Sequence, residues 1–187
     1  MKHRLFVAAN LPPEIKNRLL YTKDNNLELP AKWTKKENLH ITLVFLGDVA
    51  DEDLLDVFKK VSKVVESNKS FSIKLNRILY GPTNKLPPRM VWVEGEKSNE
   101  LGKIQKELEE SLSGLYQKQE NRGFTPHITL ARIKTWEWKQ INPEERPNIE
   151  EELNLDFEVN SIEVMESYLK RGGSQYEILE SYQLKEI

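Results

Sequence analysis

The tetrapeptide His-Ile-Thr-Leu occurs twice in the chain, at residues 40–43 and again at residues 127–130. Each copy follows a loop and opens a run of β-forming residues, so each copy predicts a strand. A segment with helical periodicity precedes each of these strands. Two similar halves related by an approximate two-fold axis would produce this repetition. We therefore expect an α+β fold in which each half contributes one of the two strands.

Hydrophobic periodicity predicts the other elements of both halves. Further strands are expected at residues 5–9, 71–79, 90–93, 155–168 and 176–184, and the first paired strand is expected to span 39–46. Helices are expected from Pro12 onward, over 51–68 and over 101–112. The expected breaks are a strand end at Gly47-Asp48, a turn at 81–84, a loop bracketed by Gly123 and Pro126, an acidic loop with short helical pieces at 136–152 and a hairpin at 170–173. No linker divides the chain, so residues 1–187 are expected to form one domain.

Alternate side chains of a strand share a face. His40 and Thr42 therefore point to one side of their strand, and His127 and Thr129 do the same in the second copy. The isoleucine and leucine of each copy point the other way, into the core. If the two strands lie side by side across the two-fold axis, they line a cleft with two imidazoles and two hydroxyls.

This set of groups suits the cleavage of a phosphate diester. A neutral imidazole can take a proton from the attacking water or hydroxyl, and an imidazolium can give a proton to the departing oxygen. Histidine serves both tasks because its unperturbed pKa, about 6.5, is close to neutral pH. Threonine hydroxyls can donate hydrogen bonds to phosphate oxygens as negative charge builds. We expect His40 and His127 to be catalytic, Thr42 and Thr129 to bind phosphate, and no metal or cofactor to take part.

An isolated histidine on a strand more often serves packing or the surface than catalysis. The chain contains only three histidines, however, and two of them open identical tetrapeptides in matching contexts. The duplication therefore favours a shared function over coincidence. His3 lies near the terminus outside any motif, and we assign it no role.

Composition narrows the class of protein further. The net charge is −2, whereas proteins that track a long nucleic-acid backbone usually carry an excess of positive charge. Any nucleic acid is therefore expected to be bound at an end or over a short stretch. Cysteine is absent, which excludes disulfides, zinc fingers and thiol nucleophiles. The apolar run at 5–9 is too short for a signal peptide or a membrane span, so we expect a soluble, cytoplasmic protein without a membrane partner. We also expect it to be a monomer.

The two tetrapeptides resemble the paired signatures of the 2H phosphoesterase superfamily, and within it the RNA 2′,3′-cyclic phosphodiesterases, also described as 2′-5′ RNA ligases. Further landmarks of this resemblance run along nearly the whole chain: Arg4 to Ala8, Trp33, Asn38-Leu39, Phe45 to Gly47, Phe124 to Pro126, Ala131-Arg132, Glu166 to Tyr168, Gly172-Gly173 and Tyr176. The resemblance implies a bilobal α+β fold. In that fold two antiparallel sheets face each other across a central cleft and the helices lie outside.

The resemblance also implies a reaction, the hydrolysis of a terminal 2′,3′-cyclic phosphate to a 2′-phosphomonoester. Its substrates are RNA 3′ ends or small nucleotides that carry the cyclic phosphate. In such enzymes the histidine of the first motif is the proton donor and that of the second is the acceptor, which makes His40 the donor and His127 the acceptor. A terminal cyclic phosphate is a short target at an RNA end, in agreement with the near-neutral net charge.

Other residues are candidates for substrate contact. The family's Ala-Arg after the second motif suggests that Arg132 holds phosphate or a base, whereas strand alternation places it on the opposite face unless the strand bulges. Phe6 is a candidate for stacking on a base, with core packing as the alternative. Lys170 and Arg171 of the hairpin are candidates for contact with the RNA backbone, with a solvated turn as the alternative.

Three alternative functions stay open at this point. The same acid–base pair serves 2′-5′ RNA ligation or the cleavage of 2′-5′ oligonucleotides. An RNA-binding module without catalysis is a second alternative, although both histidines and both threonines are present. A metal hydrolase, in which Asp48 or a distant carboxylate joins the histidines, is a third, and no short-range ligand spacing supports it.

Overall fold

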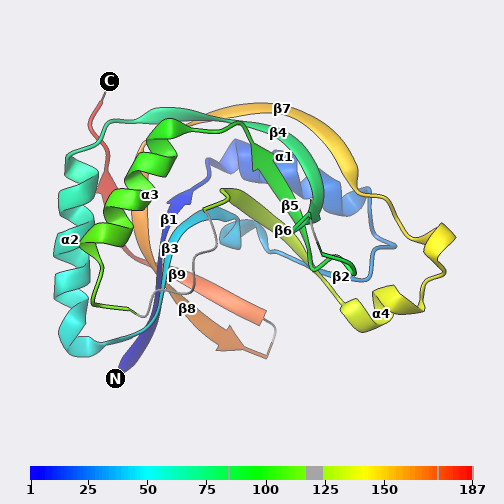
Figure 1. Cartoon of the computed structure of the whole chain (residues 1–187), viewed down its shortest axis with the longest axis horizontal. Coiled ribbons are helices and arrows are strands. Elements are labelled where there is room, and N and C mark those ends of the chain that lie inside the picture. The colour runs from blue at the N-terminus through cyan, green and yellow to red at the C-terminus, as the bar shows by residue number, and fades with distance from the viewer. Residues whose placement is uncertain (84, 117–123, 172, 187) are drawn as a thin grey trace.

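The strands and helices alternate along the chain as the sequence predicts (Figure 1). The structure is a computed structural model that describes residues 1–83, 85–116, 124–171 and 173–186. The strands are β1 (Lys2–Asn10), β2 (Ala31–Trp33), β3 (His40–Ala50), β4 (Phe71–Gly81), β5 (Met90–Gly95), β6 (His127–Ile133), β7 (Glu150–Val159), β8 (Ser161–Lys170) and β9 (Gly173–Gln183). The helices are α1 (Pro13–Asp24), α2 (Leu54–Glu66), α3 (Asn99–Ser111) and α4 (Thr135–Gln140), with short 3-10 turns η1 (Lys36–Asn38), η2 (Asp51–Asp53) and η3 (Pro143–Glu145). Asn84, Gly123 and Gly172, predicted in a turn, a loop and a hairpin, lie outside the described residues.

The strands of the described residues form one antiparallel sheet in the order β7-β4-β5-β6-β3-β1-β8-β9, with β2 paired to β6. At its centre, β3 and β6 share a single pairing, Ile41 opposite Ile128. Outward from this pair the two halves match, because β1 and β5, β8 and β4, and β9 and β7 occupy equivalent places. Helix α1 precedes β3 as α3 precedes β6. The expected α+β fold of two antiparallel, pseudo-symmetric halves is confirmed, and the two expected sheets are joined through the pairing of β3 with β6 into a single sheet.

Helices α2 and α3 lie side by side at one end of the molecule (Figure 1). Helix α2 contacts β8 and β9, and α3 contacts β3. The buried positions of α2 are Val57, Val61, Val64 and Val65, a spacing that places all four on one face. No helix in the described ranges combines the length and the apolar character that crossing a membrane requires.

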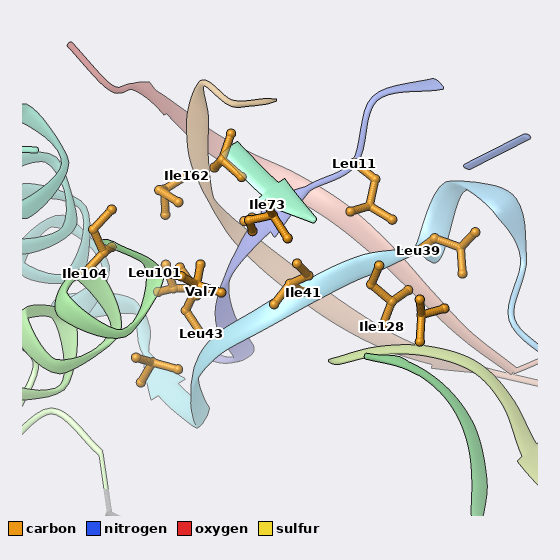
Figure 2. Close-up of a cluster of buried hydrophobic side chains, with 14 of the residues drawn as sticks. Val7, Leu11, Leu39, Ile41, Leu43, Ile73, Leu101, Ile104, Ile128 and Ile162 are labelled. Carbon is orange, nitrogen blue, oxygen red and sulfur yellow. The ribbon is translucent and has the colours of Figure 1, made fainter. Parts of the chain in front are cut away.

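The core lies on one face of the sheet. Figure 2 shows side chains from several strands, among them Val7, Ile41 and Ile128, gathered with Leu101 and Ile104 of α3. Along β1 the residues that face this core alternate with Phe6 and Ala8, which belong to a separate small cluster. The sheet therefore has one face packed against the core and a second face on which a cleft can form.

The two His-Ile-Thr-Leu strands share one irregularity. The first seven residues of β3 and of β6 have the same burial pattern: partly buried, buried, partly buried, buried, buried, exposed, buried. The two successive buried residues mark a bulge, and pairing with the neighbouring strand shifts there, between Val7 and Ala8 for β3 and between Val91 and Trp92 for β6. A bulge of one residue reverses the alternation beyond it. The residue five positions after each histidine therefore returns to the face of that histidine.

Two predicted boundaries are wrong. Strand β3 does not stop at Gly47 but continues to Ala50, because Gly47 adopts φ +71° and absorbs a second bulge opposite β1. The predicted single strand 155–168 is two strands, β7 and β8, in opposite halves of the sheet. The residues that join the main core are Phe157 and Val159 in β7 but Ile162 and Val164 in β8, so the core-facing positions change parity where the chain leaves one half for the other.

Candidate active site

A cleft of about 520 Å³ lies where the two halves meet, a volume typical of small-molecule sites. Its walls combine residues of both halves. The first half contributes Arg4, Phe6, Asn38, His40, Thr42, Phe45, Ser167, Leu169, Ser174 and Tyr176. The second half and the segment around β2 contribute Thr34, Met90, His127, Thr129 and Arg132. The four residues predicted from the repeated motif are thus brought together in one cleft.

His40 is held through both of its ring nitrogens. Nδ1 lies 2.7 Å from the backbone oxygen of Asn38, and Nε2 lies 2.9 Å from Oγ1 of Thr42. A carbonyl oxygen can only accept, so Nδ1 carries the proton and donates it to Asn38. Nε2 of the neutral ring is then the acceptor, and the hydroxyl of Thr42 donates to it. The nitrogen that faces Thr42 is therefore the one that can take up a proton or release one.

His127 repeats half of this arrangement. Its Nδ1 lies 2.8 Å from the backbone oxygen of Thr125, which again fixes the proton on Nδ1. Among the described residues, Nε2 of His127 has no hydrogen-bond partner. The ring stacks on Trp92 at 4.0 Å between centroids, with 22° between the planes. His127 is thus oriented by a backbone carbonyl and an indole.

Burial lowers the pKa of both imidazoles. Desolvation is the main cause at His40, where it outweighs the hydrogen bond to Asn38, and the charges of Lys16 and His127 add to it; the pKa falls to about 4. At His127 desolvation is again the main cause of a lowered pKa, opposed by the hydrogen bond to Thr125. Both rings are therefore neutral at neutral pH in the free protein. A bound phosphate anion would favour the protonated form of either ring.

Two aromatic rings that line the cleft contact the imidazole of His40. Phe6 lies 4.9 Å from the imidazole between centroids, and Tyr176 lies 5.3 Å from it at 80°. Phe6 is only 3% exposed and also contacts the edge of Tyr176. Of the two alternatives for Phe6, packing is the one that these contacts favour, and the surface it packs against is the imidazole.

Arg132 lines the cleft. The strand-alternation argument that placed it on the opposite face is wrong, because the bulge in β6 reverses the alternation after Thr129. The equivalent bulge in β3 brings Phe45 to the matching place in the first half. The guanidinium of Arg4 lies 5.3 Å from the centroid of the Phe45 ring, so a second arginine also lines the cleft.

The other candidates lie elsewhere. Lys170 and Arg171 are exposed on the β8–β9 hairpin and do not line the cleft. Asp48 pairs in register with Arg4 near the far end of β3. In the described part of the chain, no group of three or more histidine, aspartate or glutamate residues is arranged to hold a metal ion. His3 contacts Asp51 at 2.6 Å and Glu166 at 3.0 Å, outside the cleft.

Sequence reasoning missed several residues that shape the cleft. Asn38 supplies the carbonyl for His40, and its Nδ2 donates to the backbone oxygen of Ser174 at 2.8 Å, which ties the first histidine to β9. Trp92 and Met90 lie on β5, the strand beside the second motif. The sequence signal for Trp92 and Met90 is their place on the strand next to the second motif strand. Every second residue of such a strand lies on the same face of the sheet as the motif side chains.

A buried ionisable pair lies behind the first motif. Lys16 of α1 is 8% exposed and Glu163 of β8 is 3% exposed. Glu163 accepts hydrogen bonds from the backbone of Asn10 at 3.1 Å and from Ser161 at 2.5 Å, and Asn10 pairs with His40 across β1 and β3. Desolvation lowers the pKa of Lys16 and raises that of Glu163. The charge of Lys16 contributes to keeping His40 neutral.

Comparison with known proteins places these features in a family. Residues 12–171 match the model of the 2′-5′ RNA ligase superfamily. An RNA 2′,3′-cyclic phosphodiesterase of Methanocaldococcus jannaschii is 33% identical over 182 residues, which cover 96% of this chain and 99% of that protein. One of Aquifex aeolicus is 32% identical over 165 residues, 87% of this chain and 86% of that protein. The crystal structure of TT0787 of Thermus thermophilus superimposes with a TM-score of 0.85, covers 98% of both chains and is 25% identical.

Gly81 allows Trp92 to lie beneath His127. A Cβ at residue 81 would come within 2.1 to 2.6 Å of the indole ring. We predict that Gly81→Ala displaces Trp92, destabilises the fold by roughly 1–3 kcal/mol and lowers kcat roughly 10- to 100-fold. Urea unfolding and initial rates measure the two effects. Gly102→Ala is the matched control, because its Cβ meets open space on α3 and should add about 0.5–1 kcal/mol of stability at an unchanged rate. A Gly81→Ala protein with normal kcat would contradict the role of Trp92.

NMR can separate His3 from the two histidines of the cleft, because the pKa of His3 is raised and those of His40 and His127 are lowered. We expect the pKa of His40 near 4 and that of His127 below 6.5, since burial disfavours both cations. We expect the pKa of His3 above 6.5, because its hydrogen bonds to Asp51 and then Glu166 favour the cation. As pH falls, His3 is therefore protonated before either imidazole of the cleft. If the imidazoles of the cleft titrate at or above the pKa of His3, the geometry described for them is wrong.

Proposed function

Because the chain belongs to the 2′-5′ RNA ligase superfamily, we propose that it hydrolyses the terminal 2′,3′-cyclic phosphate of an RNA to a 2′-phosphomonoester. The observation that carries this proposal is the pair of imidazoles in one cleft, each with Nδ1 bound to a backbone carbonyl and Nε2 left for proton exchange. The names of the relatives, RNA 2′,3′-cyclic phosphodiesterases, support it. We take residues 1–187 as one bilobal catalytic domain that acts as a monomer in the cytoplasm.

The phosphate would bind between the two motif strands. Thr42 and Thr129 provide hydroxyl donors, one from each half, and Arg4 and Arg132 provide positive charge in the same cleft. Donors fixed by the sheet before substrate binds stabilise the growing negative charge without reorganising. When the substrate binds, the hydroxyl of Thr42 donates its hydrogen bond to a phosphate oxygen instead of to Nε2 of His40, and Nε2 becomes free.

Each imidazole then has one task. Nε2 of His127 takes a proton from a water molecule, and the water oxygen attacks phosphorus. The bond from phosphorus to the 3′ oxygen breaks as Nε2 of His40 gives its proton to that oxygen. The product carries the phosphate on its 2′ oxygen, and solvent exchange returns both rings to their starting states. Nε2 of His127, which has no hydrogen-bond partner among the described residues, suits a proton acceptor.

The donor role requires His40 to be protonated although its pKa in the free protein is about 4. The substrate supplies the missing interaction, because a phosphate anion next to the ring favours the imidazolium. An imidazole whose cation is disfavoured by burial is also a strong acid once protonated, which helps proton transfer to the leaving oxygen. The proton is therefore best placed on His40 when substrate is bound.

We predict that an RNA ending in a 2′,3′-cyclic phosphate is converted to a product ending in a 2′-phosphate. Typing the product end by nuclease digestion and chromatography measures this. His40→Ala and His127→Ala should each lower the rate roughly 10²- to 10⁴-fold, because each removes one proton transfer. His3→Gln is the matched control, since His3 lies outside the cleft, and its rate should equal that of the parent.

The same assay separates the alternative functions. A 3′-phosphate product, or no product, contradicts the proposed reaction. A joined 2′-5′ product from RNA with a 5′ hydroxyl would assign ligation in place of hydrolysis. RNA binding without turnover would assign a binding module. Loss of activity with a chelator, restored by a divalent ion, would assign a metal hydrolase.

A further inference from the structure

The sulfur of Met90 lies at a point where three hydrogen-bond donors converge. Nε1 of Trp92 is 3.5 Å from Sδ, Nη1 of Arg132 is 3.6 Å from it, and Oγ1 of Thr129 is 4.0 Å from it. All three donors belong to the second half of the cleft. Two of them, Thr129 and Arg132, are the groups that this half offers to a phosphate. The thioether therefore occupies the place at which those donors are aimed.

The sheet fixes this position. Met90 pairs with Arg132 and Trp92 pairs with Thr129 in the register of β5 and β6. Relative to the motif strands, Met90 occupies the place that Phe6 occupies in the first half, since Phe6 pairs with Phe45. Where the first half has the ring of Phe6, which packs against His40, the second half has a side chain whose sulfur can change its chemical state.

A thioether is a weak hydrogen-bond acceptor. A phosphate oxygen is a much stronger one, particularly for a guanidinium, and it can draw Thr129 and Arg132 away from the sulfur. Oxidation of Met90 makes the phosphate a less favoured partner for these donors. Methionine sulfoxide is polar, and its oxygen would lie among the same donors and accept their hydrogen bonds. An oxidised Met90 would thus compete with the phosphate from a fixed position.

Met90 is also the methionine best placed for such chemistry. It is partly exposed and lines the open cleft. Met165 is 3% exposed and packs in the small cluster with Phe6, whereas Met1 is 87% exposed at the terminus and does not line the cleft. The chain has three methionines and no cysteine, so no thiol competes for oxidant within the molecule.

We propose that Met90 is a site of reversible oxidation by hydroperoxides and that its sulfoxide inhibits the cleft by holding the donors that otherwise bind phosphate. The predicted loss of turnover rests on the proposed function. The predicted loss of phosphate affinity rests on the contacts of Met90 alone.

The oxidation is a two-electron oxygen transfer. A lone pair of Sδ attacks one oxygen of the hydroperoxide, the O–O bond breaks and an S–O bond forms. The second oxygen leaves as water, or as an alcohol from an organic hydroperoxide, so sulfur is oxidised and peroxide is reduced. A methionine sulfoxide reductase reverses the change, as its dithiol becomes a disulfide and the oxygen leaves as water.

The test treats the whole protein with graded hydrogen peroxide. Peptide mass spectrometry gives the sulfoxide fraction at each methionine, calorimetry gives the affinity for 2′-AMP and inorganic phosphate, and initial rates on a cyclic mononucleotide give turnover. We expect affinity and rate to fall in proportion to Met90 sulfoxide, by about tenfold or more at full oxidation, and to return after treatment with the reductase. Bound 2′-AMP should slow the oxidation of Met90 but not that of Met1.

Two variants serve as controls. Peroxide should leave the affinity and the rate of Met90→Leu at the values that this variant has before treatment. In Met165→Leu, peroxide should lower both as it does in the parent. If Met90→Leu does not fold, the dose response of the parent and its reversal by the reductase decide the question. The proposal is overturned if Met90 is fully oxidised with binding unchanged, if peroxide oxidises Met1 but spares Met90, or if Met90→Leu loses as much as the parent.

Failure of the proposed function gives a different result. An untreated protein that binds 2′-AMP but does not hydrolyse the cyclic phosphate contradicts the proposed reaction, and the binding measurements still test Met90. An untreated protein that binds neither probe contradicts both proposals.

Discussion

The hydrogen bond from Nδ1 of each imidazole to the carbonyl two residues before it is the interaction on which the cleft depends. It fixes the proton on Nδ1 and leaves Nε2 as the unprotonated nitrogen of each neutral ring. The backbone ahead of each motif strand must therefore be held as firmly as the strand itself. At the first motif this is achieved by Asn38, whose side chain binds the backbone of Ser174 on β9. Two hydrogen bonds thus connect the β8–β9 hairpin, through Asn38, to the imidazole of His40.

The two-fold symmetry of the sheet does not extend to the chemistry of its two halves. Nε2 of His40 accepts from Thr42, and its ring packs on aromatic side chains of β1 and β9. Nε2 of His127 has no partner among the described residues, and its ring stacks on Trp92. The hydroxyl of Thr129 lies near sulfur instead. Identical tetrapeptides are therefore placed in different surroundings, and the proposed split into a proton donor and a proton acceptor rests on that difference.

The sequence predicts the parts of this structure that local patterns determine. The repeated motif, strand alternation and helical spacing were enough to place His40, Thr42, His127 and Thr129 on one cleft and to pair the halves. Local patterns do not predict the bulges, because a bulge depends on pairing with a strand far away in sequence. Without the bulge in β6, strand alternation places Arg132 on the wrong face. The division of 155–168 into two strands was missed for the same reason, since only the partners β4 and β1 distinguish β7 from β8.

The measurement that tests the two-imidazole mechanism most directly is the pH dependence of kcat/KM and kcat on a cyclic mononucleotide. Turnover needs one imidazole neutral and the other protonated, so kcat/KM should be bell-shaped. Both limbs should lie below pH 6.5, because burial lowers the pKa of both rings in the free protein. The profile of kcat reports the complex and should shift to higher pH, since bound phosphate favours the imidazolium. A profile with a single ionisation, or a bell that persists in His40→Ala, would contradict the mechanism.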